Sequence, residues 1–260
     1  MVSKYFLLWV LALSPFIVSG QIRQSKLIVP ANESYDFRGS DIIVIDTLIM
    51  MDSSLIILNN SKKDNFIHAK KILIQNACSI IGLGKNGEDG KSGVRGTTQS
   101  APCRVGQDGS NATKGTNGHD GVNLTLYMDD LEIVGALVIN LNGGDGGDGG
   151  KGGRGGDGGS GTRVCRAGNG GSGGSGANGG AGGNGGSVGI HCRNCDDLHL
   201  IMGNKLIIKN FGGFGGIGGE GGFGGRPGLG PAGDGKNGIR GKDGRTAPQG
   251  KSGIVNLSRN

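Results

Sequence analysis

One short segment contains the clearest metal-ligand chemistry in this chain. Cys192 and Cys195 form a CxxC motif flanked by His191 and His199, so thiol and imidazole groups suited to zinc stand close together. In a secreted chain, however, two cysteines three positions apart are more often oxidised to a disulfide. We therefore expect Cys192 and Cys195 to close a small ring, and we expect no metal and no other cofactor.

Pairs of carboxylates form a second group. The Asp-Asp pairs at 129–130 and 196–197 each precede a leucine, as paired acids do in some β-helix polysaccharide lyases and hydrolases. Another block has a Lys-Lys pair at 70–71 in the same place, which fits a repeated turn, and no aromatic sugar platform accompanies the acids. We expect a protein without enzymatic activity, and a β-helix carbohydrate-active enzyme is the less favoured alternative.

Three glycine motifs imitate ligand-binding sequences without their context. GLGKNG at 82–87 has the spacing of a dinucleotide-binding turn, but no helix can follow it. GGDGGD at 143–148 begins like a calcium-binding repeat but lacks its apolar position and tandem copies. GKNGEDGKSGVRG at 84–96 has the collagen period but no proline. We favour the repetitive glycine pattern itself as the explanation of all three.

Arginine gathers near the middle of three glycine-rich segments, where prolines add rigid turns. A basic, rigid and exposed turn suits anionic surface groups such as sulfated or phosphorylated glycans, and we expect no nucleic-acid partner. The alternative is that these arginines only keep the turns soluble. The predicted ligand-binding residues are Arg104, Arg163, Arg166 and Arg226.

Composition limits how these residues can be positioned. The chain has 260 residues, of which 60 are glycine and 4% are aromatic, and its net charge is +6. Apolar residues cluster in short blocks between glycine-rich blocks, unlike those of an ordinary globular core. Residues 1–20 have the apolar run and small-residue end of a secretory signal peptide. We expect a secreted, extracellular protein with no stable membrane span.

The apolar blocks predict a mainly β fold. After a lead-in at 21–39, similar blocks recur about every 20 to 24 residues once the glycine segments are removed, and each contains several short β-type runs. Such a repeat is typical of a solenoid in which each coil buries its apolar side against the next. We predict one domain at 40–260, a short parallel β-solenoid of about four coils. A small β-sandwich is the alternative.

Three glycine-rich inserts, at 82–121, 143–187 and 212–253, leave the solenoid just after a strand. Each keeps a period of three outward and back, which a flexible linker has no reason to keep. A polyproline-II-like helix has three residues per turn and leaves its backbone groups free to bond with neighbouring helices. The inserts therefore predict six polyglycine-II helices as three hairpins.

The number of glycines per triplet predicts where each arm lies. Both arms of the second insert have two glycines per triplet and can contact neighbours on two sides, so we expect them in the middle. The first insert and the returning half of the third have one glycine per triplet and belong at the edges. This arrangement gives two rows of three helices.

The cysteines suggest cross-links at the tips. Cys103 and Cys165 lie near the midpoints of the first and second inserts, in the matching texts Cys-Arg-Val-Gly and Cys-Arg-Ala-Gly. We expect a disulfide between them, which stabilises by roughly 4 kcal/mol in the loop-entropy model. Cys78 should remain a buried free thiol.

The triplet pattern of the inserts resembles that of polyglycine-II bundle proteins. The snow-flea antifreeze protein, the T-even phage tail-fibre adhesins and the glycine-rich domain of the Obg GTPases share this period over about half of the present chain. The resemblance implies a shared architecture, with tip loops that touch a receptor in the adhesins. No GTPase motif is present here.

The returning half of the second insert displays short, uncharged residues at every third position, opposite a charged outgoing half. Such a flat face is what an ice-binding protein needs, although threonine and valine are absent from it. The residues of this alternative site are Ser172, Ser175, Asn178, Ala181, Asn184 and Ser187.

Two further patterns concern the surface. We expect the apolar series Phe214, Ile217 and Phe223 to pack against the flank of the solenoid or another subunit. Five Asn-x-Ser/Thr sequons are compatible with a glycoprotein. They lie at Asn32, Asn59, Asn111, Asn123 and Asn256. The leading hypothesis is a secreted structural or adhesive protein that presents basic tips to a surface ligand, with ice binding as the alternative.

Overall fold

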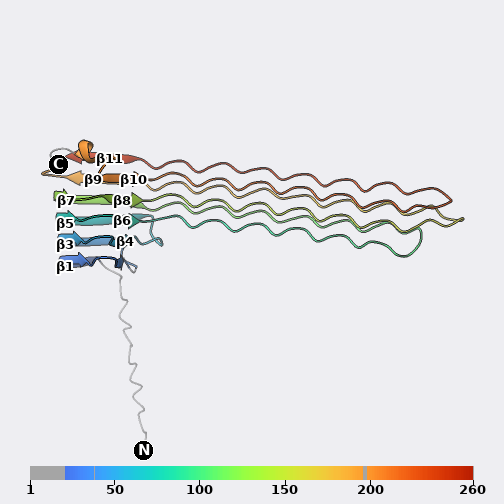
Figure 1. Cartoon of the computed structure of the whole chain (residues 1–260), viewed down its shortest axis with the longest axis horizontal. Coiled ribbons are helices and arrows are strands. Elements are labelled where there is room, and N and C mark those ends of the chain that lie inside the picture. Colours follow the sequence, from blue (N-terminus) through green and yellow to red (C-terminus); the bar gives the residue numbers. More distant parts are fainter. Residues whose placement is uncertain (1–20, 38, 196–197, 260) are drawn as a thin grey trace, which may run out of the picture.

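The computed structural model describes residues 21–37, 39–195 and 198–259. The expected signal peptide and the acidic pair at 196–197 lie outside the described residues. The described chain forms two parallel sheets and one four-residue helix, α1 (Leu198–Ile201). This is the mainly β, parallel and solenoid-like fold that the repeated apolar blocks predict, and Figure 1 shows its strands stacked at one end of the molecule.

Consecutive strands alternate between the two sheets, so each sheet pairs every second strand of the chain. The first sheet contains, in spatial order, β1 (Ile22–Val29), β3 (Ile42–Met50), β5 (Asp64–Ile74), β7 (Asn123–Ile133), β9 (Val188–Cys192) and β11 (Val255–Arg259). The second contains β10 (Leu206–Lys209), β8 (Leu137–Asn140), β6 (Cys78–Ile81), β4 (Leu55–Ile57) and β2 (Ser34–Asp36).

The core consists of like residues stacked in register between the sheets. Because side chains alternate along a strand, every second residue points inward, and parallel pairing places these residues above one another. One column of the first sheet runs through Ile22, Ile43, Ile67, Leu126, Ile190 and Leu257. A facing column of the second runs through Tyr35, Ile56, Ile80, Ile139 and Ile208.

The segment at 21–39 is more than a lead-in. It forms β1 and β2, which pair in parallel with β3 and β4 and so continue both sheets by one strand. The pattern of this segment is weak because its coil lies at the end of the stack: only Leu27 and Val29 of β1 are buried, and its other residues are exposed or half-buried.

Charged residues line part of the outer face of the first sheet. Lys70 Nζ lies 2.8 Å from Asp46 Oδ1, and Arg193 pairs with Asp129 at 3.2 Å. The hydrogen bond and positive charge of Lys70 lower the pKa of Asp46, and the same carboxylate raises the pKa of Lys70. These pairs are largely exposed and add little stability individually.

The glycine-rich inserts extend the two sheets. The outgoing arms 1, 2 and 3 (84–96, 143–160 and 212–228) follow β6, β8 and β10 of the second sheet. The return arms 1, 2 and 3 (106–121, 168–187 and 235–253) lead into β7, β9 and β11 of the first. Figure 1 shows these segments running side by side away from the strands to tips at the far end of the molecule.

Backbone hydrogen bonds at every third residue join the arms that continue one sheet. Gly84 N donates to Asn142 O at 2.9 Å, and Gly143 N donates to Phe211 O at 2.9 Å, which connects the outgoing arms in the order 1-2-3. Bonds such as Gly106 N to Asn169 O at 2.8 Å start the corresponding series in the return arms.

A second set of bonds joins outgoing arms to return arms. Gly144 N donates to His119 O at 2.9 Å, Gly171 N to Gly156 O at 2.8 Å, and Gly238 N to Gly225 O at 2.9 Å. Outgoing arm 2 therefore bonds with outgoing arms 1 and 3 and with return arms 1 and 2. Its two glycine amides in each triplet both donate to neighbouring backbones, which explains why both positions lack side chains.

Candidate ligand site at the hairpin tips

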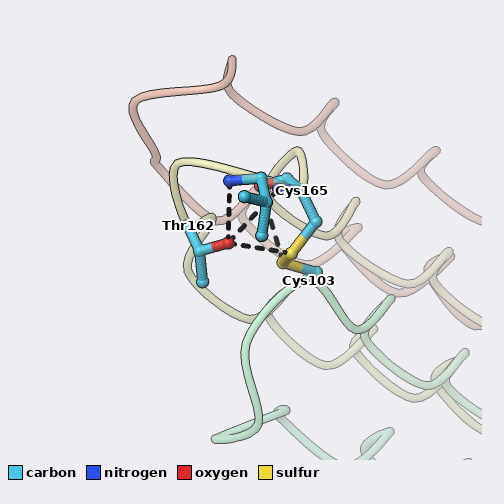
Figure 2. Close-up of a disulfide and its surroundings, with 4 residues drawn as sticks. Cys103, Thr162 and Cys165 are labelled. Carbon is cyan, nitrogen blue, oxygen red and sulfur yellow. Dashed lines mark hydrogen bonds between the residues drawn. A yellow bond between two sulfur atoms is a disulfide. The ribbon is translucent and has the colours of Figure 1, made fainter.

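A disulfide joins the tips of the first two inserts. Cys103 and Cys165 are bonded, with their Cα atoms 6.1 Å apart, as their positions in the sequence predict. Thr162 Oγ1 accepts the backbone N–H of Cys165 at 3.2 Å and also lies 3.2 Å from its sulfur, as Figure 2 shows. Cys103 N donates to Ser160 O at 2.8 Å, so the bridge is held by backbone bonds on both sides.

The tip loops carry the four predicted arginines, and all four are exposed. Arg166 Nε donates to the carbonyl of Asp234 at 2.7 Å, which ties the second tip to the third. Across 97–106, 160–168 and 226–236, five residues are basic and one, Asp234, is acidic. Among the described ion pairs, none involves an arginine of the tips.

Exposed apolar residues at the tips were not predicted from the sequence. Val164 is 95% exposed and Val105 is largely exposed, each directly after a tip arginine, and the largely exposed Leu229 lies three residues after Arg226. Their signal was present, since an apolar residue follows Arg104 and Arg163 directly. Together they make the tips both basic and apolar, a combination that suits contact with a surface better than charge alone.

The short residues of return arm 2 have a structural role that their size does not reveal. Their backbone amides are capped by side chains of return arm 1: Asp108 Oδ1 accepts from Ser172 N at 2.6 Å, and Asp120 Oδ1 accepts from Asn184 N at 2.6 Å. In turn, Asn184 Oδ1 accepts from Lys251 N of return arm 3 at 2.9 Å. The three return arms are thus connected by side chain-to-backbone bonds as well as by backbone bonds.

The outgoing arms show the same device. Asn86 Oδ1 accepts from Asp145 N at 2.9 Å, and Asp145 Oδ1 accepts from Phe214 N at 2.7 Å. The third amide of many triplets, which faces solvent, is therefore bonded to a neighbouring Asn, Asp, Ser or Thr side chain. Many polar residues of both faces are explained by this satisfaction of the backbone, without any ligand.

Replacing Asn184 with alanine is expected to lower the free energy of unfolding by about 1 kcal/mol, because Lys251 N loses its acceptor. Asn184→Asp keeps an acceptor oxygen and should stay close to the parent. Urea unfolding monitored by circular dichroism distinguishes the two variants. Equal losses for Ala and Asp would show that the cap has no energetic role.

The remaining chemical candidates are engaged in structure. Cys192 and Cys195 form the expected disulfide, so their thiolates are not free to bind zinc, and Cys78 is a buried free thiol. Of the acidic pair at 129–130, the first carboxylate pairs with Arg193 and the second accepts from Asn194 Nδ2 at 3.1 Å. On the same outer face, the rings of Tyr127 and His191 stack with centroids 4.6 Å apart.

The other surface predictions differ in their outcome. Phe214, Ile217 and Phe223 do not pack against the solenoid: they are 64–69% exposed along outgoing arm 3, because that arm runs away from the strands. The guanidinium of Arg240 lies over the Phe223 ring, 5.2 Å from its centroid. Of the sequon asparagines, Asn59 is buried, Asn123 is half-buried, and the others are exposed; their glycosylation stays a prediction.

Part of this chain is similar to a solved structure. No protein-family model matches the chain, and no curated protein matches it. One solved structure, a springtail antifreeze protein from Granisotoma rainieri described as a nine polyproline type II helical bundle, is 29% identical. The match covers 57% of this chain and 93% of that one, with a TM-score of 0.14.

Proposed function

We propose that this chain is a secreted structural or adhesive protein without enzymatic activity, whose inserts form a rigid bundle that presents basic tips to an anionic surface ligand. The six arms of this proposal are polyglycine-II helices in two rows of three, grown from a short solenoid. The bonds at every third residue support the helical assignment, since such helices have three residues per turn.

The exposure of the tip arginines is the observation that favours this function. The guanidinium groups of Arg104, Arg163 and Arg226 have no acceptor among the described hydrogen bonds and ion pairs, while backbone bonds and the Cys103–Cys165 bridge hold their loops. At a rise near 3.1 Å per residue, the 18 residues of outgoing arm 2 place the tip roughly 56 Å from the strands. Charges on a preorganised loop bind with a smaller loss of entropy than charges on a mobile one.

The proposed secretion is consistent with the two disulfides. The two disulfides are compatible with an oxidising, extracellular environment, and no helix in the described residues is long and apolar enough to cross a membrane. Sulfated or phosphorylated glycans are the ligand class that the arginines suit best, because guanidinium groups bind such anions through paired N–H donors.

The test is binding of the full mature protein to immobilised heparin, as a sulfated glycan, and to a glycan array. The double variant Arg104→Ala/Arg163→Ala should bind about tenfold more weakly, since each exposed contact contributes up to about 1 kcal/mol. The matched control Lys26→Ala/Lys62→Ala removes two exposed positive charges from the solenoid and should bind like the parent. Equal weakening in both variants would reduce the interaction to net charge and refute a tip site.

Ice binding is the second candidate, and the uncharged stripe on return arm 2 is the observation that favours it. The stripe is flanked by Asp108 and Asp120 on one side and by Lys242 and Lys251 on the other, all of them exposed. Thermal hysteresis of the purified protein decides this question directly. If the parent shows thermal hysteresis and the Ser175→Lys variant does not, ice binding is the function and the adhesive proposal is wrong.

A further inference from the structure

The face of the three outgoing arms carries its charges in an ordered series. Along outgoing arm 2, the non-glycine residues of four successive triplets are Asp145, Asp148, Lys151 and Arg154, two acids followed by two bases. The next is Asp157, which pairs with Arg154 of the same arm at 3.5 Å. Successive members are about 9 Å apart at the rise of a polyglycine-II helix. A series of this kind is complementary to its own reverse.

We propose that this outgoing face binds the same face of a second copy of the chain, with the two bundles antiparallel. A two-fold axis midway between Asp148 and Lys151 places Asp148 of one copy opposite Lys151 of the other, and Asp145 opposite Arg154. Symmetry repeats each pair, so four oppositely charged pairs form. Asp145 and Asp148 each use one oxygen to cap an amide of outgoing arm 3, and no hydrogen bond or ion pair described in the structure uses the second oxygen.

The same two-fold axis also pairs apolar residues of outgoing arm 3. The caps set Asp145 level with Phe214, and Lys151 pairs with Glu220 at 3.9 Å, so the two arms share one register. In that register, the axis that joins the charges also places Phe214 opposite Phe223 of the second copy. Rings at both positions are 66–69% exposed, an exposure that is costly in a monomer and is removed when they pack together.

The same axis pairs the other residues of outgoing arm 3 with those of the second copy. Phe211, 59% exposed, comes opposite Arg226 of the second copy, which allows a cation–π contact. Ile217 comes opposite Glu220, whose charge is balanced by Lys151 of its own chain. The lysine thus lies between two carboxylates, one from each copy.

Other arrangements bring like charges together. A parallel pairing places Asp145 opposite Asp145 and Lys151 opposite Lys151. An antiparallel pairing shifted by one triplet places Asp148 opposite Asp148 in one direction, and Lys151 opposite Lys151 in the other. Like charges in direct contact are unfavourable, so the charge series selects a single register as well as a direction.

The shape of the face fits this arrangement. Residues of all three outgoing arms line one open groove centred on the expected axis: Asp89, Ser92, Asp148, Lys151, Ile217 and Glu220. Taking an arm spacing like that of β-strands, the overlapping surface is about 50 Å long and 15 Å wide, roughly 750 Å² per copy. That area is close to the value of about 800 Å² per partner found in stable complexes. The surface shares Arg226 with the tips but otherwise lies along the outgoing arms, and the inference does not depend on the proposed function.

Light scattering and cross-linking test the proposal on the full mature chain. Lys151→Glu sets an acid opposite Asp148 at two symmetric places, so the dimer measured by sedimentation or light scattering should weaken at least about tenfold. Lys242→Glu, an exposed lysine of return arm 3, makes the same charge change on the opposite face and should leave the dimer intact. A parent protein that is monomeric at its highest soluble concentration overturns the proposal.

The register has its own test. In the double variant Phe214→Cys/Phe223→Cys, a short bismaleimide should link position 214 of one copy to 223 of the other. Each single variant should stay unlinked, because two copies of position 214 lie about 28 Å apart in this arrangement. Efficient linking of a single variant, or none in a double variant that still dimerises, would show a different interface.

Discussion

Gly147→Ala is expected to destabilise the folded protein by about 3 kcal/mol, although it adds only one methyl group. Gly147 lies in the middle of outgoing arm 2, where its amide donates to Thr116 O at 2.9 Å. A Cβ atom there would overlap the carbonyl group of Glu88 in outgoing arm 1. Because that neighbour is backbone, no rotamer change relieves the overlap, and the arm itself must move away and strain its bonds. The midpoint of urea unfolding measures the loss.

Ala177 supplies the matched control, since it is an alanine at a glycine position of return arm 2. The backbone adapts locally to it: Ala177 N lies 3.0 Å from Gly150 O, whereas Gly174 N and Gly180 N, one triplet to either side, lie 2.8 Å from their acceptors. Ala177→Gly should therefore change stability by less than about 1 kcal/mol, because relief of this local expansion offsets the extra freedom of glycine in the unfolded chain. A Gly147→Ala variant as stable as the parent would contradict the close approach of the outgoing arms.

Removal of the tip bridge by Cys103→Ser/Cys165→Ser is expected to lower the free energy of unfolding by about 4 kcal/mol in the loop-entropy model. The bridged residues are 62 positions apart, so the bond restricts a large part of the unfolded chain. Fraying should begin at the tips, where backbone amides such as Gly159 N and Gly106 N would exchange faster with solvent. Thermal unfolding and hydrogen exchange, each under non-reducing conditions, report the two effects.

The second disulfide provides the comparison. Cys192 and Cys195 are only three positions apart, so Cys192→Ser/Cys195→Ser should cost about 2 kcal/mol in the same model and leave exchange at the tips unchanged. Equal losses for the two double variants would argue against loop entropy as the source of the stability. Exchange at the tips that is unchanged in Cys103→Ser/Cys165→Ser would show that the interarm hydrogen bonds alone hold the loops.

The repeats in the sequence were sufficient to predict the parallel strands and the disulfide at the tips. The blocks that precede Lys70 and Asp129 repeat closely enough to predict parallel strands in register, and the pairing of β5 with β7 aligns Lys71 with Asp130. Cys103 and Cys165 could be paired because each lies at the midpoint of a triplet series that must turn back. Both inferences depend on repetition along the chain, which a single sequence displays directly.

Features that depend on contact between different arms were not predicted. Asn86, Asp108 and Asn184 look like ordinary solvent-exposed polar residues, and only the structure shows that their oxygens cap amides in a neighbouring arm. A signal existed: the capping pairs recur at constant separations, 59 residues between outgoing arms 1 and 2 and 64 between return arms 1 and 2. The coil of β1 and β2 was missed because an end coil needs few apolar residues.

Those constant separations restrict how the length of this protein can change. Inserting one residue into any arm would shift every later cap and every interarm bond out of step, so an insertion is tolerable only as a whole triplet, added to an outgoing arm and to its return arm together. Unless the other hairpins grow equally, the added turn has no neighbours to bond with. The reach of the tips is therefore quantised in steps of about 9 Å, and each step requires six coordinated insertions.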